Sequence, residues 1–221
     1  MYFLSHPISS LNHFVARLVT DQITIVLSII LFVLLSLNYK KTFWQDMDEK
    51  VFKWVEDGKE NFVKKHSEDL AIFGNAIFHI LFSVVLALIF FLTRHTTNEV
   101  FPILFVLIFS WGLNRVMKLI FKRERPNFTA NSSKKRLSYC FPSGHVMASL
   151  PIYFFSAVIL QNFVAFIPWY LIALVISYSV IMSRIYLNHH YFTDVLGGVF
   201  MGIFCLNISI WFYFFFIVGQ I

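Results

Sequence analysis

Six long apolar stretches dominate the chain, and each is close to the length that an α-helix needs to cross a lipid bilayer. They cover residues 22–38, 70–93, 100–120, 146–161, 163–182 and 195–219. A hydrocarbon core about 30 Å thick requires roughly 20 apolar residues per helix. Only 14% of the 221 residues are charged, whereas soluble domains usually carry about a quarter. The sequence therefore predicts an all-α membrane protein, a bundle of six transmembrane helices that forms a single domain over residues 1–221.

Two boundaries decide the number of spans. Lys40 and Lys41 follow the first stretch without a small-residue cleavage site, so we interpret this stretch as a retained span rather than a signal peptide. The fourth and fifth stretches are almost continuous. We divide them at Gln161 and Asn162 because a single helix of that length would overshoot the bilayer.

Charge and cysteine content narrow the class of partner. In a chain this apolar, the net charge of +6 fits anionic lipid headgroups or a phosphorylated substrate better than nucleic acid. The chain has two cysteines, Cys140 and Cys205, too few for a disulfide scaffold. We therefore expect a membrane-embedded protein without a nucleic-acid partner.

Residues 39–69, between the first two spans, have a different composition. Seven lysines and eight acidic residues alternate with apolar side chains at helical spacing. This pattern favours one or two amphipathic helices that lie in the membrane interface. An ordinary extramembrane helical hairpin packed on the bundle is the alternative. In either arrangement the segment would shield one end of the bundle and help to guide a lipid towards it.

Regularly spaced basic residues end the third span. They are Arg115, Lys118, Lys122 and Arg125. Intervals of three, four and three residues place them on one helical face, provided that the helix continues to just before Pro126. Taken alone, such residues are also typical of a basic rim that reaches anionic headgroups.

A short polar motif, Phe141-Pro142-Ser143-Gly144-His145, opens the fourth span. Pro and Ser are common at helix starts, and the first N–H groups of a helix have no intrahelical acceptor. This position can therefore hold an anion. A capped helix with an interfacial histidine is the alternative.

The link between the fifth and sixth spans carries Ser183, Arg184, His189, His190 and Asp194. Asp194 follows His190 by four residues, one helical turn, where a carboxylate would orient the imidazole; His189 would point elsewhere. A histidine with a carboxylate partner is suited to act as a nucleophile or base, whereas adjacent histidines in a loop are also typical metal ligands. A metal would need further ligands, and neither cysteine is spaced to provide them.

An alternating path of six spans places these three groups of residues on the same side of the membrane. The first group ends span three, the second begins span four, and the third links spans five and six. Cationic side chains, a helix N-terminus and two histidines would then face one another. The sequence therefore predicts one anion site equipped for chemistry.

Together, the three groups resemble the three-part signature of the type 2 phosphatidic acid phosphatase superfamily, which includes membrane lipid phosphatases. The first matching segment, residues 118–126, has Lys118, six intervening residues and then Arg125-Pro126. The second, residues 142–145, is Pro142-Ser143-Gly144-His145. The third, residues 183–194, is Ser183-Arg184 followed by His190 and Asp194. All three match in order and without substitution. The spacing of the signature selects His190 over His189, in agreement with the helical-face argument.

The resemblance implies a role for each matched residue. His190 would attack phosphorus and form a phosphohistidine, with Asp194 orienting its ring. His145 would protonate the departing oxygen and then activate water. The phosphoryl oxygens would be bound by Lys118, Arg125, Ser143, Gly144 and Arg184. Because cations take the role that metals play in other phosphatases, we expect no metal and no other cofactor. Three basic residues outside the signature are interpreted as rim or headgroup contacts: Arg115, Lys122 and Arg123.

The implied function is hydrolysis of a lipid phosphomonoester or diphosphate. The candidate substrates are phosphatidate, phosphatidylglycerol phosphate, undecaprenyl diphosphate and the phosphates of lipid A. Gly144 favours a broad lipid phosphatase, because some polyprenyl diphosphate phosphatases carry Asp at this position. A lipid phosphotransferase with the same phosphohistidine is the alternative.

Two other function classes fit less well. A transporter would place polar residues deep in several spans, and Asn75 and His79 are among few such residues here. An intramembrane serine protease that uses Ser143 with a histidine would leave the cations of the signature unexplained.

Two arguments about orientation conflict. Of the 18 Lys and Arg residues, only Arg17 and Arg94 fall on the side opposite the motifs, so the positive-inside rule predicts a cytoplasmic active site. Bacterial members of the resembled family generally have the site on the periplasmic face, and several of the counted cations are catalytic there. We expect a multi-pass protein of the bacterial inner membrane with a periplasmic site, against the positive-inside count.

Overall fold

The structure is a computed structural model that describes residues 22–94, 98–126 and 139–218. Helices account for all of the regular secondary structure in these ranges. They are α2 (Gln22–Asn38), α3 (Thr42–Asp57), α4 (Phe62–Lys65), α5 (Ser67–Ile72), α6 (Ala76–Arg94), α7 (Val100–Phe121), α8 (Gly144–Phe163), α9 (Trp169–Tyr186) and α10 (Phe192–Val218). The predicted all-α fold is confirmed.

Five helices, α6 to α10, are long and apolar enough to cross a membrane. Helix α2 has 17 residues and meets α3 at a bend of 94°, and the two together form a sixth candidate span. Five to six candidate spans agree with the predicted bundle.

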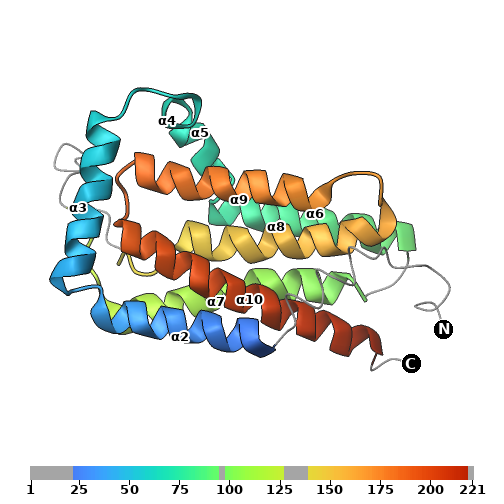
Figure 1. The fold of residues 1–221 in the computed structure, drawn as a ribbon. Coiled ribbons are helices and arrows are strands. Elements are labelled where there is room, and N and C mark those ends of the chain that lie inside the picture. Colours follow the sequence, from blue (N-terminus) through green and yellow to red (C-terminus); the bar gives the residue numbers. More distant parts are fainter. Residues whose placement is uncertain (1–21, 95–97, 127–138, 219–221) are drawn as a thin grey trace.

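Helix α8 forms the centre of the bundle (Figure 1). It packs against α7, α9 and α10, and 72% of its span is buried. Outer helices α2 and α6 instead expose large apolar side chains such as Leu27 and Leu81. Apolar residues that face outward on a bundle of this length are typical of contact with lipid.

The amphipathic segment predicted within residues 39–69 forms α3, α4 and α5. Figure 1 shows α3 crossing one end of the bundle. Its buried face carries Phe52 and Val55, and Val55 belongs to an apolar cluster with Ile185 and Val195 from the α9 and α10 ends. The segment therefore covers the end of the bundle at which α7 and α9 finish and α8 and α10 begin.

Two predicted span boundaries were wrong. The second span begins at Ala76 rather than at residue 70, because the chain turns at Gly74 and Asn75, whose N–H groups donate to Ala71 and Ile72. The fifth span begins at Trp169 rather than at residue 163. A proline disfavours helical conformation in the residue before it, so α9 starts only after Pro168.

The end of α7 also differs from the prediction. We expected the helix to continue to just before Pro126, but it ends at Phe121, and Lys122 adopts a left-handed conformation (φ 45°) as the C-cap. Such a residue reverses the chain after a helix. The following segment pairs with the approach to α8, where the N–H of Cys140 donates to the carbonyl of Arg123 at 2.9 Å. Arg125 therefore reaches the end of the bundle from a loop and not from the helical face.

Candidate active site

His190 and Asp194 lie side by side at the start of α10. Nδ1 of His190 is 3.5 Å from Oδ2 of Asp194, and the two side chains are 2% and 0% exposed. His190 precedes the helix rather than lying on it, yet the spacing of four residues correctly predicted the contact. The other ring nitrogen, Nε2, lies 3.5 Å from Nη1 of Arg125.

Burial lowers the pKa of His190 to about 4, and the positive charges of Arg125 and Lys118 act in the same direction. The carboxylate of Asp194 opposes this shift without cancelling it. The imidazole is therefore neutral near pH 7, with one nitrogen that carries a proton and one that is free to act as an acceptor or nucleophile.

The predicted phosphate-binding cations gather around the two histidines. Nη1 of Arg125 donates to the carbonyl of His189 at 2.9 Å, which holds the guanidinium beside His190. Arg184 is buried near the end of α9, and its Nε donates to Oγ of Ser183 at 3.3 Å. His145 lies within electrostatic range of Arg184, His190 and Lys118. Residues from three separate segments thus form one cationic site.

The turn before α8 presents polar groups to this site. Ser143 is the N-cap residue of α8, but its hydroxyl does not cap the helix. Its Oγ is buried and has no hydrogen-bond partner among the described residues. The backbone N–H of Ser143 donates to the carbonyl of Asp194 at 2.9 Å, which joins the turn to α10. A buried hydroxyl without a partner beside a helix N-terminus is suited to an anionic ligand.

Gly144 is tightly packed against α7. A Cβ at this position would lie 2.8 Å from Oδ1 of Asn114. Nδ2 of the same buried asparagine donates to the carbonyl of Pro142 at 3.2 Å. Asn114, which we did not select from the sequence, therefore supports the turn. Its position one helical turn before Lys118 in an apolar helix was the available signal.

His145 is held by the turn before α6. Its Nε2 lies 2.9 Å from Oδ1 of Asn75. The neighbouring Gly74 leaves room for this contact, because a Cβ there would lie 2.9 Å from the His145 ring. Asn75 therefore contacts His145 from the turn just before a span, rather than lying deep within one.

The interpretation of Arg123 as a rim or headgroup contact was wrong. Its side chain is only 11% exposed, and Nη1 lies 2.7 Å from Oδ1 of Asp194 while Nη2 lies 3.0 Å from Oδ2 of Asp48. The reversal after Lys122 turns it inward, between the rings of Tyr39 and Tyr191. Two residues of the proposed rim are exposed as expected: Arg115 and Lys122.

Asp48 on α3 was also missed. It is one of eight acidic residues in the first loop, so the composition of the loop does not distinguish it from the others. Its position in the helix does distinguish it, because Asp48, Phe52 and Val55 are spaced four and three residues apart and form the buried face of α3. A carboxylate on an apolar helical face indicates a buried partner.

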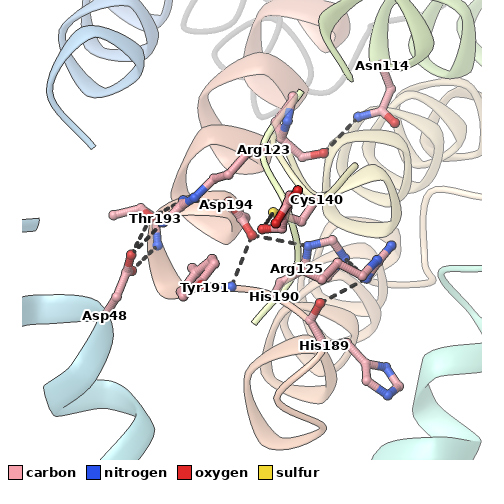
Figure 2. A network of polar contacts seen from close by, with 12 residues as sticks. Asp48, Asn114, Arg123, Arg125, Cys140, His189, His190, Tyr191, Thr193 and Asp194 are labelled. Carbon is pink, nitrogen blue, oxygen red and sulfur yellow. Dashed lines mark hydrogen bonds and ion pairs between the residues drawn. The ribbon is translucent and has the colours of Figure 1, made fainter. Parts of the chain in front are cut away.

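The remaining polar residues do not favour the rival functions. His79 is buried inside the bundle, where its Nε2 lies 3.2 Å from Oγ of Ser149. Ser143 makes no hydrogen bond to a histidine among the described residues, as a serine–histidine catalytic pair would require. Figure 2 shows the ring of His189 turned away from Asp194, in agreement with the selection of His190.

Comparisons with known proteins agree on one family. The model of the PAP2 superfamily matches residues 99–217, a region that includes every residue of the signature. Phosphatidylglycerophosphatase B from Bacillus subtilis is 30% identical over 166 residues, which cover 72% of this chain and 79% of that protein. The crystal structure of a transmembrane PAP2 type phosphatidylglycerolphosphate phosphatase from Bacillus subtilis superposes with a TM-score of 0.77 at 27% identity, covering 86% of this chain and 95% of the other.

Proposed function

The chain belongs to the PAP2 superfamily and is a membrane-embedded lipid phosphatase, and from that premise we propose that it hydrolyses phosphatidylglycerol phosphate through a phosphohistidine at His190. The arrangement of His190 carries the mechanism: Nδ1 faces the carboxylate of Asp194, and Nε2 faces the guanidinium of Arg125. The substrate is supported by the names of both relatives, which refer to the phosphate of phosphatidylglycerol phosphate.

In the first step, Nε2 of His190 attacks phosphorus and the bond from phosphorus to the lipid oxygen breaks. The proton on Nδ1 points to Asp194, so the lone pair is on Nε2, and the carboxylate stabilises the positive charge that the ring acquires. His145 gives a proton to the departing lipid oxygen. With Nε2 of His145 donating to Asn75, the transferred proton comes from its Nδ1.

In the second step, a water molecule attacks the phosphohistidine. His145, now neutral, takes a proton from that water through Nδ1, and the bond between phosphorus and His190 breaks. Inorganic phosphate leaves, and both histidines return to their starting forms. The same imidazole thus acts first as an acid and then as a base, as required when one group serves both halves of a displacement.

Cations and backbone donors supply the electrostatic stabilisation. Lys118, Arg125 and Arg184, with the hydroxyl of Ser143 and the N–H of Gly144, would bind the phosphoryl oxygens, over which charge is spread in the transition state. These donors take the role that a divalent ion plays in other phosphatases. The proposed reaction therefore uses no metal.

The location of the site at one end of an apolar bundle suits a lipid substrate. The phosphate would bind at the end of the bundle that α3 crosses (Figure 1), while the acyl chains remain against the apolar helices. Water would enter from this end of the bundle to complete the second step, and the phosphate product would be released to the same side.

We place this site on the outer face of the bacterial inner membrane, as expected from the family. The buried position of Arg123 weakens the contrary positive-inside count, because a cation paired with two carboxylates is no longer a free topological signal. Arg17 lies outside the described residues. Both native cysteines are buried, so a cysteine placed at the exposed Lys53 of α3 can report the orientation. A membrane-impermeant maleimide should label it from outside the inner membrane, and protection would place the site in the cytoplasm.

Phosphate release by the purified protein tests the substrate. The panel contains phosphatidylglycerol phosphate, phosphatidate, undecaprenyl diphosphate and lipid A, with the His190→Ala protein as the blank. We expect the highest kcat/KM for phosphatidylglycerol phosphate. Faster turnover of another lipid would identify that lipid as the preferred substrate and would not affect the assignment of the reaction as phosphate hydrolysis. Transfer of phosphate to an added alcohol in place of water would identify a phosphotransferase.

A further inference from the structure

Three side chains from distant parts of the sequence meet behind the catalytic pair. Nη1 of Arg123 donates to Oγ1 of Thr193 at 2.7 Å, and Oγ1 of Thr193 donates to Oδ2 of Asp48 at 2.8 Å. Arg123 also contacts both carboxylates, Asp48 and Asp194. Figure 2 shows this network between α3 and the start of α10.

The two oxygens of the Asp194 carboxylate have different partners. Oδ1 accepts from Nη1 of Arg123 at 2.7 Å. Oδ2 accepts from the backbone N–H of Tyr191 at 3.0 Å and faces Nδ1 of His190 at 3.5 Å. With Oδ1 held, the carboxylate has one orientation, and that orientation presents Oδ2 to His190.

Asp48 joins α3 to the same place. Its Oδ1 accepts from the N–H of Thr193 at 2.8 Å, so a carboxylate from one helix caps the first turn of another. His190 and Asp194 lie on either side of Thr193. A displacement of α3 would therefore move the segment that carries His190 and Asp194.

Because Asp48 and Asp194 are buried and Arg123 is nearly so, the loss of any one of these charges would destabilise the other two. The side chains of Asp48 and Asp194 are 6% and 0% exposed, and Arg123 supplies the positive charge between them. Although burial disfavours the charged guanidinium, the two carboxylates hold the pKa of Arg123 above its usual value. Removing one partner of a buried charge network leaves an uncompensated charge, which costs far more than losing an exposed pair.

Arg123 is not arranged to bind the phosphate. Nη1 contacts Thr193 and Asp194, and Nη2 contacts Asp48. A cavity of about 500 Å³ lies on this side, with Asp48, Arg123 and Tyr191 in its wall, and none of the eight residues assigned to the reaction lines it. The guanidinium thus acts on the site through the carboxylate.

We propose that Asp48 and Arg123 are positioning residues that hold Asp194 in the orientation required by His190, which makes α3 a working part of the active site. The proposal rests on the function proposed above and adds to it two residues that lie outside the signature.

Kinetics of purified variants on phosphatidylglycerol phosphate test the proposal. Partners that orient a ligand or catalytic group typically contribute about 10- to 100-fold, so Arg123→Gln should lower kcat by about 100-fold and Asp48→Asn by about 10-fold, with KM nearly unchanged. Asp48→Asn keeps an acceptor for Thr193 but removes the charge. Arg123→Lys keeps the charge without the forked geometry and should restore only part of kcat.

Two exposed neighbours are matched controls: Lys122→Gln beside Arg123 and Glu49→Gln beside Asp48. Both should keep kcat within about twofold, as usual for surface changes. In a protein that already carries Asp194→Asn, Arg123→Gln should cost little more, because the group that it positions is gone.

The outcomes separate this proposal from the proposed function. A folded Arg123→Gln protein with wild-type kcat, or a full additional loss in the Asp194→Asn background, overturns the positioning role and leaves the phosphatase reaction intact. If Arg123→Gln does not fold, Asp48→Asn and Arg123→Lys decide the question, and wild-type kcat in both overturns the role. A wild-type protein that releases no phosphate from any lipid of the panel instead defeats the proposed function.

Discussion

The guanidinium of Arg123 lies 2.7 Å from the carboxylate of Asp194 and leaves the other carboxylate oxygen to face His190. The gap on the His190 side is 3.5 Å, longer than an ordinary hydrogen bond. Catalytic hydrogen bonds often tighten only when substrate binds. Because phosphorylation makes the His190 ring cationic, we expect this contact to shorten in the phosphoenzyme.

Asn75 should be important for the proton transfers of His145. Asn75→Ala removes the acceptor at 2.9 Å from Nε2, so the ring loses its fixed orientation and tautomer. We expect kcat to fall by about 10- to 100-fold, measured as phosphate release in detergent. Asn38→Ala is the control, because the side chain of Asn38 makes a local hydrogen bond to the carbonyl of Leu34 in α2 and none to another segment that the structure describes. Equal activities of the two variants would contradict the role of Asn75.

Gly144 and Gly112 form a matched pair of glycines in neighbouring helices. A Cβ at Gly144 would meet Oδ1 of Asn114 at 2.8 Å, whereas one at Gly112 would meet nothing within 4 Å. Gly144→Ala should displace the turn and lower both activity and melting temperature. Gly112→Ala should leave activity unchanged and stabilise the helix by about 0.5 to 1 kcal/mol. A fully active Gly144→Ala protein would show that the close packing does not position the turn.

The stability of the protein at low pH should depend on the protonation of His190. Burial lowers its pKa to about 4 from the ordinary 6.5. Between these values the unfolded chain binds a proton that the folded chain does not, so stability falls as the pH falls from 6.5 to 4 and is unaffected by this group above 6.5. This difference in the pKa of His190 corresponds to about 3 kcal/mol in the free energy of unfolding.

The comparison of wild type with His190→Asn isolates this contribution from those of the carboxylates. Melting temperatures from pH 7 to pH 4.5 should fall more steeply for the wild-type protein. Parallel curves would mean that His190 titrates normally in the folded state.

Metal independence is a further prediction. Excess chelator should leave the rate of phosphate release unchanged, because Lys118, Arg125 and Arg184 take the place of a divalent ion. Vanadate should inhibit by occupying the phosphate site. Activity that is lost to chelator and restored by Mg²⁺ would point to a different mechanism.

Much of the site could be predicted because it depends on short spacings and on topology. Asp194 follows His190 by four positions, and an alternating path brings the ends of α7 and α9 to the starts of α8 and α10 (Figure 1). The spans themselves followed from apolar length. Their ends were less predictable, since the breaks before Ala76 and Trp169 depend on single turns within nearly continuous apolar sequence.

The residues that support the site could not be predicted in the same way. Arg123 belongs to a run of basic residues, and only the left-handed turn at Lys122 directs it inward. Asp48 lies 75 positions away from its partner, in a segment rich in other carboxylates. Contacts between such distant segments depend on the packing of α3 across the bundle, which periodicity alone does not determine.

Direct detection of a phosphohistidine at His190 is the sharpest test of the proposed mechanism. Purified protein is mixed with phosphatidylglycerol phosphate labelled in its terminal phosphate, quenched under alkaline conditions within milliseconds, and digested for mass spectrometry of the phosphorylated peptide. We expect a phosphoryl group on His190, no covalent label and no phosphate release in His190→Ala, and nearly normal turnover in His189→Ala. Full phosphate release by a folded His190→Ala protein would contradict the proposed mechanism.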